Sequence, residues 1–139
     1  MKFFFDSNVL VYLCDSATPK KRAIAETLLE RHLLDQNIVI STQVLQEFYV
    51  TVTRKLKPPV PPADAANMVS AFADFPMVQI DTLLIQAAIR RSQASKLSFW
   101  DGLIVQAALA GGANVLYSED LQDGQVIDGM KVSNPFKSG

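Results

Sequence analysis

The chain has 139 residues, of which 49% are hydrophobic and 19% are charged, values close to those of ordinary globular proteins. General disorder and a fibrous repeat are therefore excluded, and the length predicts one domain over residues 1–139, because two independent cores would each be near the lower limit for folding. The 13 basic and 14 acidic residues give a net charge of −1, so nucleic-acid binding requires a local basic patch or a metal ion.

The N-terminal segment predicts a strand, a turn and two helices. An apolar strand over residues 2–5 ends at Asp6, and Asn8 is the expected N-cap of a short helix. A longer surface helix is predicted over residues 19–35, because a proline opens it and its apolar residues recur at helical spacing.

A second strand–helix unit follows. The β-branched run at residues 38–40 predicts a strand, and Ser41 or Thr42 is expected to cap the next helix. Four prolines between residues 57 and 62 end that helix and form a stiff connection within one domain, before an alanine-rich helix over residues 63–75.

The second half of the chain continues the alternation. A strand is expected at residues 77–80, followed by a helix that Asp81 or Thr82 caps. Ser98 opens a nearly all-apolar, buried helix over residues 100–110. The remaining strands are predicted at residues 114–117 and, as short edge strands, at residues 126–127 and 131–132. Alternating strands and helices predict an α/β fold with a mainly parallel sheet covered on both faces.

Cys14 and His32 are the only residues of their kinds. A single cysteine excludes an intrachain disulfide and a multi-thiolate zinc site, and Cys14 is expected to be a small buried residue. A single histidine excludes Ser-His-Asp catalysis and HExxH zinc hydrolases, and His32 is expected to border the core. The sequence contains neither a membrane-spanning stretch nor a secretory signal, so the expected location is the cytoplasm.

Four carboxylates come from four distant segments: Asp6, Glu47, Asp101 and Asp120. In an open parallel sheet, ligands bind beyond the carboxyl ends of the strands, so these acids are expected to converge on one edge. Clustered carboxylates cannot all ionise without a cation between them, and oxygen ligands suit Mg²⁺ or Mn²⁺. The chemistry natural to such a site is the metal-assisted hydrolysis of a phosphodiester.

Structural alternatives exist for these acids. Asp101 lies three residues after Ser98, in the spacing of a helix capping box. Asp120 competes with Glu119 and Asp123 in a segment where acids also suit a turn.

The first two acids are harder to explain as local structure. Asp6 follows three phenylalanines, and although it can bond to the backbone of the next turn, a buried acid must be paired, protonated or metal-bound. Glu47 lies beyond the first turn of its helix, between Val44 and Phe48, where it cannot serve as a cap.

The order of these motifs resembles the PIN-domain ribonucleases, particularly the VapC-type toxins of bacterial toxin–antitoxin pairs. The resemblance covers residues 2–127, and it is carried by Asp6-Ser7-Asn8, Leu45-Gln46-Glu47-Phe48, Phe99-Trp100-Asp101 and Ser118-Glu119-Asp120-Leu121. It implies a three-layer α/β/α sandwich with a mainly parallel central sheet. It also implies a Mg²⁺-dependent endoribonuclease, a homodimer and a cognate antitoxin whose peptide covers the acidic groove.

The resemblance also assigns roles to the residues. Asp6, Glu47, Asp101 and Asp120 are the implied catalytic acids. Asp6 and Asp101 would be the main metal ligands, Asp120 a ligand directly or through water, and Glu47 a ligand or a group that orients water. Asn8 and Ser118 would support the site by hydrogen bonds.

The basic residues that are candidates for RNA phosphate contacts fall in three groups, although such groups are usually the solvated faces of helices. They are Lys20, Lys21 and Arg22; Arg54, Lys55 and Lys57; and Arg90, Arg91 and Lys96.

Two other functions compete with the ribonuclease. One is a non-catalytic PIN-like module that binds RNA or protein. The other is a phosphatase of the haloacid-dehalogenase type, which also has an aspartate after its first strand. Such enzymes require a second aspartate two residues further on, where this chain has Asn8.

Overall fold

The computed structural model describes residues 1–137 and contains a six-stranded sheet with the strand order β3-β2-β1-β4-β6-β5. The strands are β1 (Phe3–Phe5), β2 (Ile38–Ser41), β3 (Met77–Val78), β4 (Val115–Tyr117), β5 (Val126–Ile127) and β6 (Met130–Ser133). Every neighbouring pair is parallel except β5 and β6. The parallel pairs bring the carboxyl ends of five strands to the same edge of the sheet.

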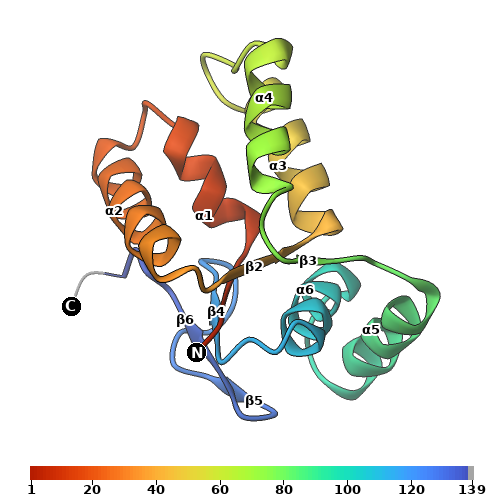
Figure 1. The fold of residues 1–139 in the computed structure, drawn as a ribbon. Helices are drawn as coiled ribbons and strands as arrows, with labels where there is room; N and C mark the ends of the chain where they lie inside the picture. Colours follow the sequence, from red (N-terminus) through yellow and green to blue (C-terminus); the bar gives the residue numbers. More distant parts are fainter. Residues whose placement is uncertain (138–139) are drawn as a thin grey trace.

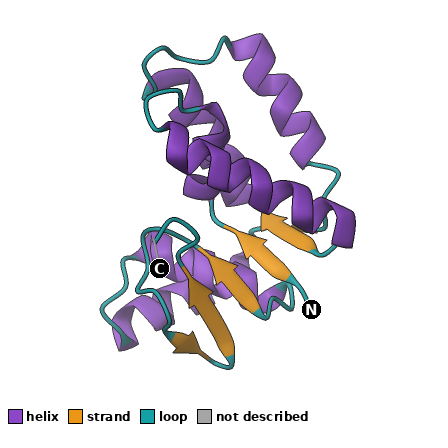
Figure 2. Cartoon of the chain, turned by 90° about the vertical axis from the view of Figure 1, so that its left-hand side faces the viewer, coloured by secondary structure: helices purple, strands orange, loops and turns teal. Residues whose placement is uncertain are grey.

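Two layers of helices enclose this sheet. The helices are α1 (Ser7–Val11), η1 (Tyr12–Cys14), α2 (Pro19–Asp35), α3 (Thr42–Arg54), α4 (Pro62–Phe72), α5 (Thr82–Ala94) and α6 (Phe99–Ala110). Helices α1 to α4 lie on one side, whereas α5 and α6 lie on the other (Figure 1). The side view in Figure 2 shows the strands between the two helical layers. The predicted three-layer sandwich with a mainly parallel sheet is therefore confirmed.

Two local expectations are wrong. The N-cap of α1 is Asp6, because its backbone is extended and its side chain accepts a hydrogen bond from the Ser7 amide; Asn8 already lies inside the helix. Lys131 and Val132 belong to β6, which lies between β4 and β5 instead of at the edge. The strand is too short for its sequence pattern to reveal this parallel pairing with a distant strand.

Other elements agree with the sequence more closely. Helix α2 has the predicted bounds, and Ser41 caps α3 by accepting a hydrogen bond from the Val44 amide at 3.4 Å. Strand β3 is shorter than expected, because only Met77 and Val78 pair with β2. None of the helices within residues 1–137 has the length and apolar character needed to cross a membrane.

The single histidine is a buried structural residue. His32 is 3% exposed, and its Nδ1 lies 2.9 Å from the Asn37 side-chain oxygen. Because that oxygen is an acceptor, Nδ1 carries the proton and Nε2 accepts from the Tyr117 hydroxyl at 3.0 Å. Cys14, by contrast, is only half-buried, with its sulfur 3.5 Å from the sulfur of Met68.

Tyr117→Phe is expected to lower the free energy of unfolding by about 1–2 kcal/mol, because the buried His32 Nε2 loses the hydroxyl that donates to it. Urea unfolding at neutral pH measures this change. Tyr49→Phe is the matched control, since Tyr49 is 38% exposed, and its effect should stay within about 0.5 kcal/mol. Equal effects of the two substitutions would contradict a stabilising bond between Tyr117 and His32.

Candidate carboxylate site

The four predicted acids lie where the topology brings the ends of several elements together. Asp6 follows β1, and Asp120 lies three residues after β4, the strand that pairs with β1. The Asp6 amide donates to the Tyr117 carbonyl at 3.0 Å, which extends this pairing to the edge of the sheet. Glu47 is on α3, which follows β2, and Asp101 is in the first turn of α6.

Asp6 is the most deeply buried of the four, with 3% of its surface exposed. Its Oδ1 accepts from the Ser7 amide at 2.7 Å, and its Oδ2 accepts from the Ser118 hydroxyl at 2.8 Å. The Asn8 side-chain amide lies 3.4 Å from the same Oδ2 and 3.1 Å from Asp120 Oδ2. Asn8 and Ser118 therefore contact Asp6 and tie it to the segment after β4.

Glu47 is held by two side chains that the sequence analysis did not single out. Ser7 Oγ donates to Glu47 Oε1 at 3.0 Å and lies 3.5 Å from Asp6 Oδ1, so one hydroxyl spans the two acids. Gln43 Nε2 lies 3.3 Å from Glu47 Oε2 and at the same distance from the Trp100 carbonyl. Gln43 precedes Glu47 by one helical turn. This spacing is the only feature of the sequence that indicates the contact.

The three acids after β4 have different partners. Glu119 accepts from the Tyr12 hydroxyl and from Lys21 Nζ, both at 2.5 Å. Burial acts to raise the pKa of Glu119, but the hydrogen bonds from Lys21 and Tyr12 outweigh this effect. The pKa of Glu119 is therefore lowered. Asp123 accepts from the Asn134 amide at 2.7 Å. Asp120 is the one that contacts Asn8 beside Asp6.

Asp101 combines a local structural role with proximity to the other acids. Its amide donates to Ser98 Oγ at 3.1 Å, so Ser98 caps α6 as the capping-box alternative predicts. Its carboxylate is half-buried, and burial raises its pKa, with the negative charge of Asp120 adding to the rise and Ser98 opposing it. Asp101 therefore takes part in the N-terminal cap of α6 through its amide and interacts with the charge of Asp120 through its carboxylate.

The electrostatics connect all four acids. Burial, with smaller contributions from the negative charges of Glu47 and Asp120, raises the pKa of Asp6 from 3.8 to about 7, against hydrogen bonds from Ser118 and Ser7 that lower it. Among the described residues, no lysine or arginine forms an ion pair with any of the four. The site therefore concentrates negative charge without a protein cation to balance it.

This oxygen-only donor set fits a hard divalent cation such as Mg²⁺ or Mn²⁺. The uncompensated charge and the raised pKa of Asp6 are consistent with a group that is ionised only beside a cation. Within residues 1–137, no three His, Cys, Asp or Glu side chains form a ready-made ion site. The ligand set of Asp6, Asp101 and Asp120 thus stays a prediction.

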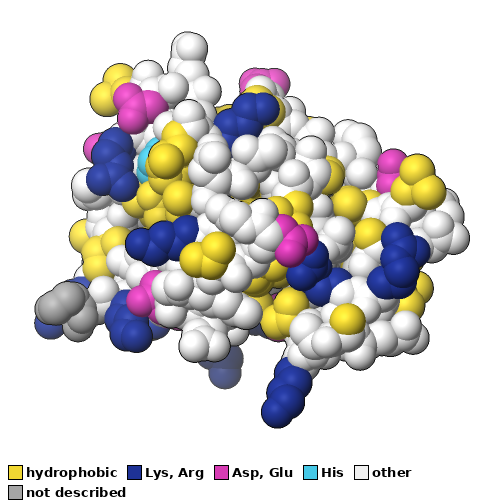
Figure 3. Space-filling view, turned by 90° about the horizontal axis from the view of Figure 1, so that it is seen from below, with side chains coloured by type: hydrophobic (Ala, Val, Ile, Leu, Met, Phe, Trp, Pro, Cys, Tyr) yellow, Lys and Arg dark blue, Asp and Glu magenta, His cyan; other side chains and the backbone are white. Residues whose placement is uncertain are grey.

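Some of the candidate basic residues are engaged within the fold. Lys21 pairs with Glu119, Arg22 with Glu26 at 3.1 Å, and Arg91 with Asp128 at 2.6 Å. On the face shown in Figure 3, lysine and arginine side chains are spread among apolar and acidic ones instead of forming one patch.

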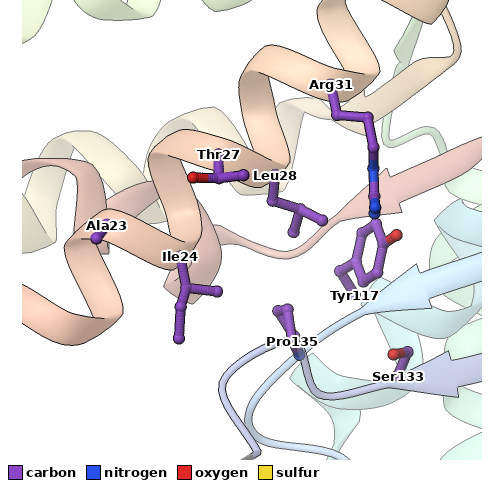
Figure 4. Close-up of a pocket in the computed structure, with 8 residues that line it drawn as sticks. All are labelled: Ala23, Ile24, Thr27, Leu28, Arg31, Tyr117, Ser133 and Pro135. Atoms are coloured by element: carbon purple, nitrogen blue, oxygen red, sulfur yellow. The ribbon is translucent and has the colours of Figure 1, made fainter.

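A separate cavity of about 500 Å³ lies away from the carboxylates. In Figure 4, Ile24, Leu28 and Arg31 of α2 face Tyr117 and Pro135 across this cavity. Its lining contains no aspartate or glutamate, so it is not an alternative location for the acidic chemistry.

The sequence matches the family profile of the PIN domain over residues 3–122. A comparison with curated proteins finds no match. Several solved structures have a similar fold. The VapC20 toxin of Mycobacterium tuberculosis, a Sarcin-Ricin loop cleaving toxin, has 17% identity and a TM-score of 0.62, with 86% of this chain and 90% of that one covered.

Two structures of complexes are also similar. A toxin–antitoxin complex from Klebsiella pneumoniae has 20% identity and a TM-score of 0.70, with 99% of this chain and 100% of that one covered. VapBC2 from Rickettsia felis, bound to a DNA fragment from its promoter, has 20% identity and a TM-score of 0.64, with 96% and 98% covered. At these identities the likeness establishes the fold.

Proposed function

The chain belongs to the PIN domain family, and on this premise we propose that it is a divalent-metal-dependent endoribonuclease. The observation that carries the proposal is the convergence of acids from distant segments: the Ser7 hydroxyl lies 3.0 Å from Glu47 Oε1 and 3.5 Å from Asp6 Oδ1, and the Asn8 amide lies within 3.4 Å of Asp6 Oδ2 and Asp120 Oδ2. Burying a carboxylate among like charges is costly, so such an arrangement favours a function that requires it.

Asp6, Asp101 and Asp120 would hold Mg²⁺ or Mn²⁺, and Glu47 would be a further ligand or orient water. When bound, the cation lowers the pKa of the attacking water and neutralises charge on the phosphate. Ser118 and Asn8 fix the rotamer of Asp6, and Ser7 and Gln43 fix the carboxylate of Glu47. Asp120, not Glu119 or Asp123, is the proposed fourth acid, because the other two are engaged elsewhere.

The proposed biological role is that of a cytoplasmic VapC-type toxin, active as a homodimer and inhibited by a cognate antitoxin whose peptide covers the acidic groove. Its support is the similarity in fold to VapC20 and to two toxin–antitoxin complexes. The competing non-catalytic module would keep the fold and partners but lack hydrolysis.

Incubation of the purified, antitoxin-free protein with a mixed RNA pool tests the proposal. Cleavage is expected with Mg²⁺ or Mn²⁺ and should stop in EDTA, because the acids alone cannot stabilise charge on phosphate. Gel electrophoresis of the RNA measures the result. Absence of cleavage by the folded, metal-replete protein would contradict the ribonuclease and favour the non-catalytic module.

A further inference from the structure

A pocket of about 450 Å³ adjoins the carboxylate site. Its lining includes Ser7, Gln43, Gln46, Glu47, Lys55 and Trp100. Ser7 and Glu47 line this pocket and also belong to the carboxylate site, since the Ser7 hydroxyl connects Glu47 to Asp6. The pocket is therefore continuous with the proposed catalytic acids.

Trp100 forms an exposed wall of this pocket. Its surface is 62% exposed, and it is not part of the hydrophobic core of the described residues. The indole meets the Phe99 ring edge to face, with the ring centroids 5.1 Å apart, and the Trp100 carbonyl lies 3.3 Å from Gln43 Nε2. A large aromatic surface is thus held beside Asp101 without contributing to the core.

Gln43 adds a second, independent feature. The residue is 3% exposed, and its Nε2 contacts both Glu47 and the Trp100 carbonyl. Its Oε1 is buried and has no hydrogen-bond partner among residues 1–137. An unpaired acceptor costs free energy, and a donor from a bound molecule would remove that cost.

We infer that this pocket binds one nucleobase of the RNA, stacked on Trp100 next to the phosphodiester that the acids cleave; the inference rests on the proposed function. An exposed indole is a stacking surface for any base, and the Gln46 amide and the unpaired Oε1 of Gln43 offer hydrogen-bonding groups to a base edge. Lys55 supplies positive charge for a neighbouring phosphate. The negative charge of Glu47 in the wall favours the uncharged base, and not a phosphate, as the group that enters the pocket.

Tryptophan fluorescence tests this inference directly, because Trp100 is the only tryptophan in the chain. The protein carries Asp6→Asn to prevent cleavage, and the probes are random RNA hexamers and ribose–phosphate hexamers without bases. The RNA is expected to quench the fluorescence, whereas the abasic chain should not, because stacking requires a base. If Asp6→Asn does not fold, Asp120→Asn, on an exposed residue, replaces it.

Affinity is measured in parallel by anisotropy of labelled RNA. Trp100→Ala should weaken RNA binding about 10-fold and leave abasic-chain binding unchanged, whereas Trp100→Phe should stay within about threefold of the parent. Leu83→Ala, at a 75% exposed residue on α5, is the matched control and should have no effect. These four results together support a base-stacking subsite.

The experiments distinguish failure of the nucleobase subsite from failure of the proposed ribonuclease activity. If wild-type protein cleaves RNA but RNA binding neither quenches Trp100 nor depends on it, the nucleobase subsite is wrong and the ribonuclease stands. If Trp100→Ala weakens capture of a protein partner but leaves RNA binding unchanged, the pocket is a protein interface and the nucleobase subsite is wrong. If wild-type protein neither binds nor cleaves RNA, both proposals fail.

Discussion

Asp6→Asn and Asp101→Asn are each expected to lower the rate of metal-dependent RNA cleavage by about 10³-fold, a loss of several kcal/mol of transition-state stabilisation. Each substitution removes one negative charge and one carboxylate oxygen of a proposed metal ligand, and within residues 1–137 no lysine or arginine forms an ion pair with these acids. Initial rates with RNA in excess and saturating Mg²⁺ measure the effect.

Asp123→Asn is the matched control, because it makes the same chemical change three residues after Asp120 and keeps the oxygen that accepts from the Asn134 amide. Its rate should stay within about twofold of the wild-type rate. Circular dichroism confirms that each variant is folded. Equal losses in Asp123→Asn and Asp6→Asn, or full activity of Asp6→Asn, would contradict the assignment of the acids.

In EDTA, the stability of the wild-type protein relative to Asp6→Asn is expected to fall by about 4 kcal/mol between pH 4 and pH 8. The pKa of Asp6 is about 7 in the folded protein, against 3.8 for an aspartate in an unfolded chain. Between these values the folded state binds more protons than the unfolded state, so stability decreases as the pH rises. Above pH 7 the folded protein must contain a buried, uncompensated charge.

Urea unfolding of both proteins at a series of pH values measures this difference, because titrating groups that do not interact with Asp6 contribute equally to both. Asp6→Asn is expected to be the more stable protein at pH 8 in EDTA, although it is the less active one. Saturating Mg²⁺ should reduce this difference in stability between Asp6→Asn and the wild type, since a cation stabilises the ionised carboxylate of the wild type. Parallel pH profiles in EDTA would show that the pKa of Asp6 is not raised.

Local patterns predicted the parts of the fold that depend on neighbouring residues. Ser41, Asp81 and Ser98 cap helices as their sequence contexts indicate, since a cap bonds an amide two or three residues away. The same reasoning placed Asp6 directly after a buried strand. The order of the strands explains why acids from distant segments lie at one edge.

Contacts between distant segments were not predictable in this way. Lys21 pairs with Glu119 across 98 residues, and this pairing separates Glu119 from Asp120 although both follow the same strand. The bridging role of Ser7 depends on the packing of α1 against α3, which no local pattern encodes. The interior place of β6 likewise depends on tertiary pairing.

The position of β1 has a consequence for the synthesis of the protein on the ribosome. Phe5 pairs with Tyr117, and Asp6 accepts from Ser118, so residues separated by 112 positions in the chain share one centre. A nascent chain that ends before β4 contains Asp6, Glu47 and Asp101 but lacks the strand that aligns them with Asp120. The proposed nuclease would therefore remain inactive until the ribosome has translated β4 and the segment that contains Asp120.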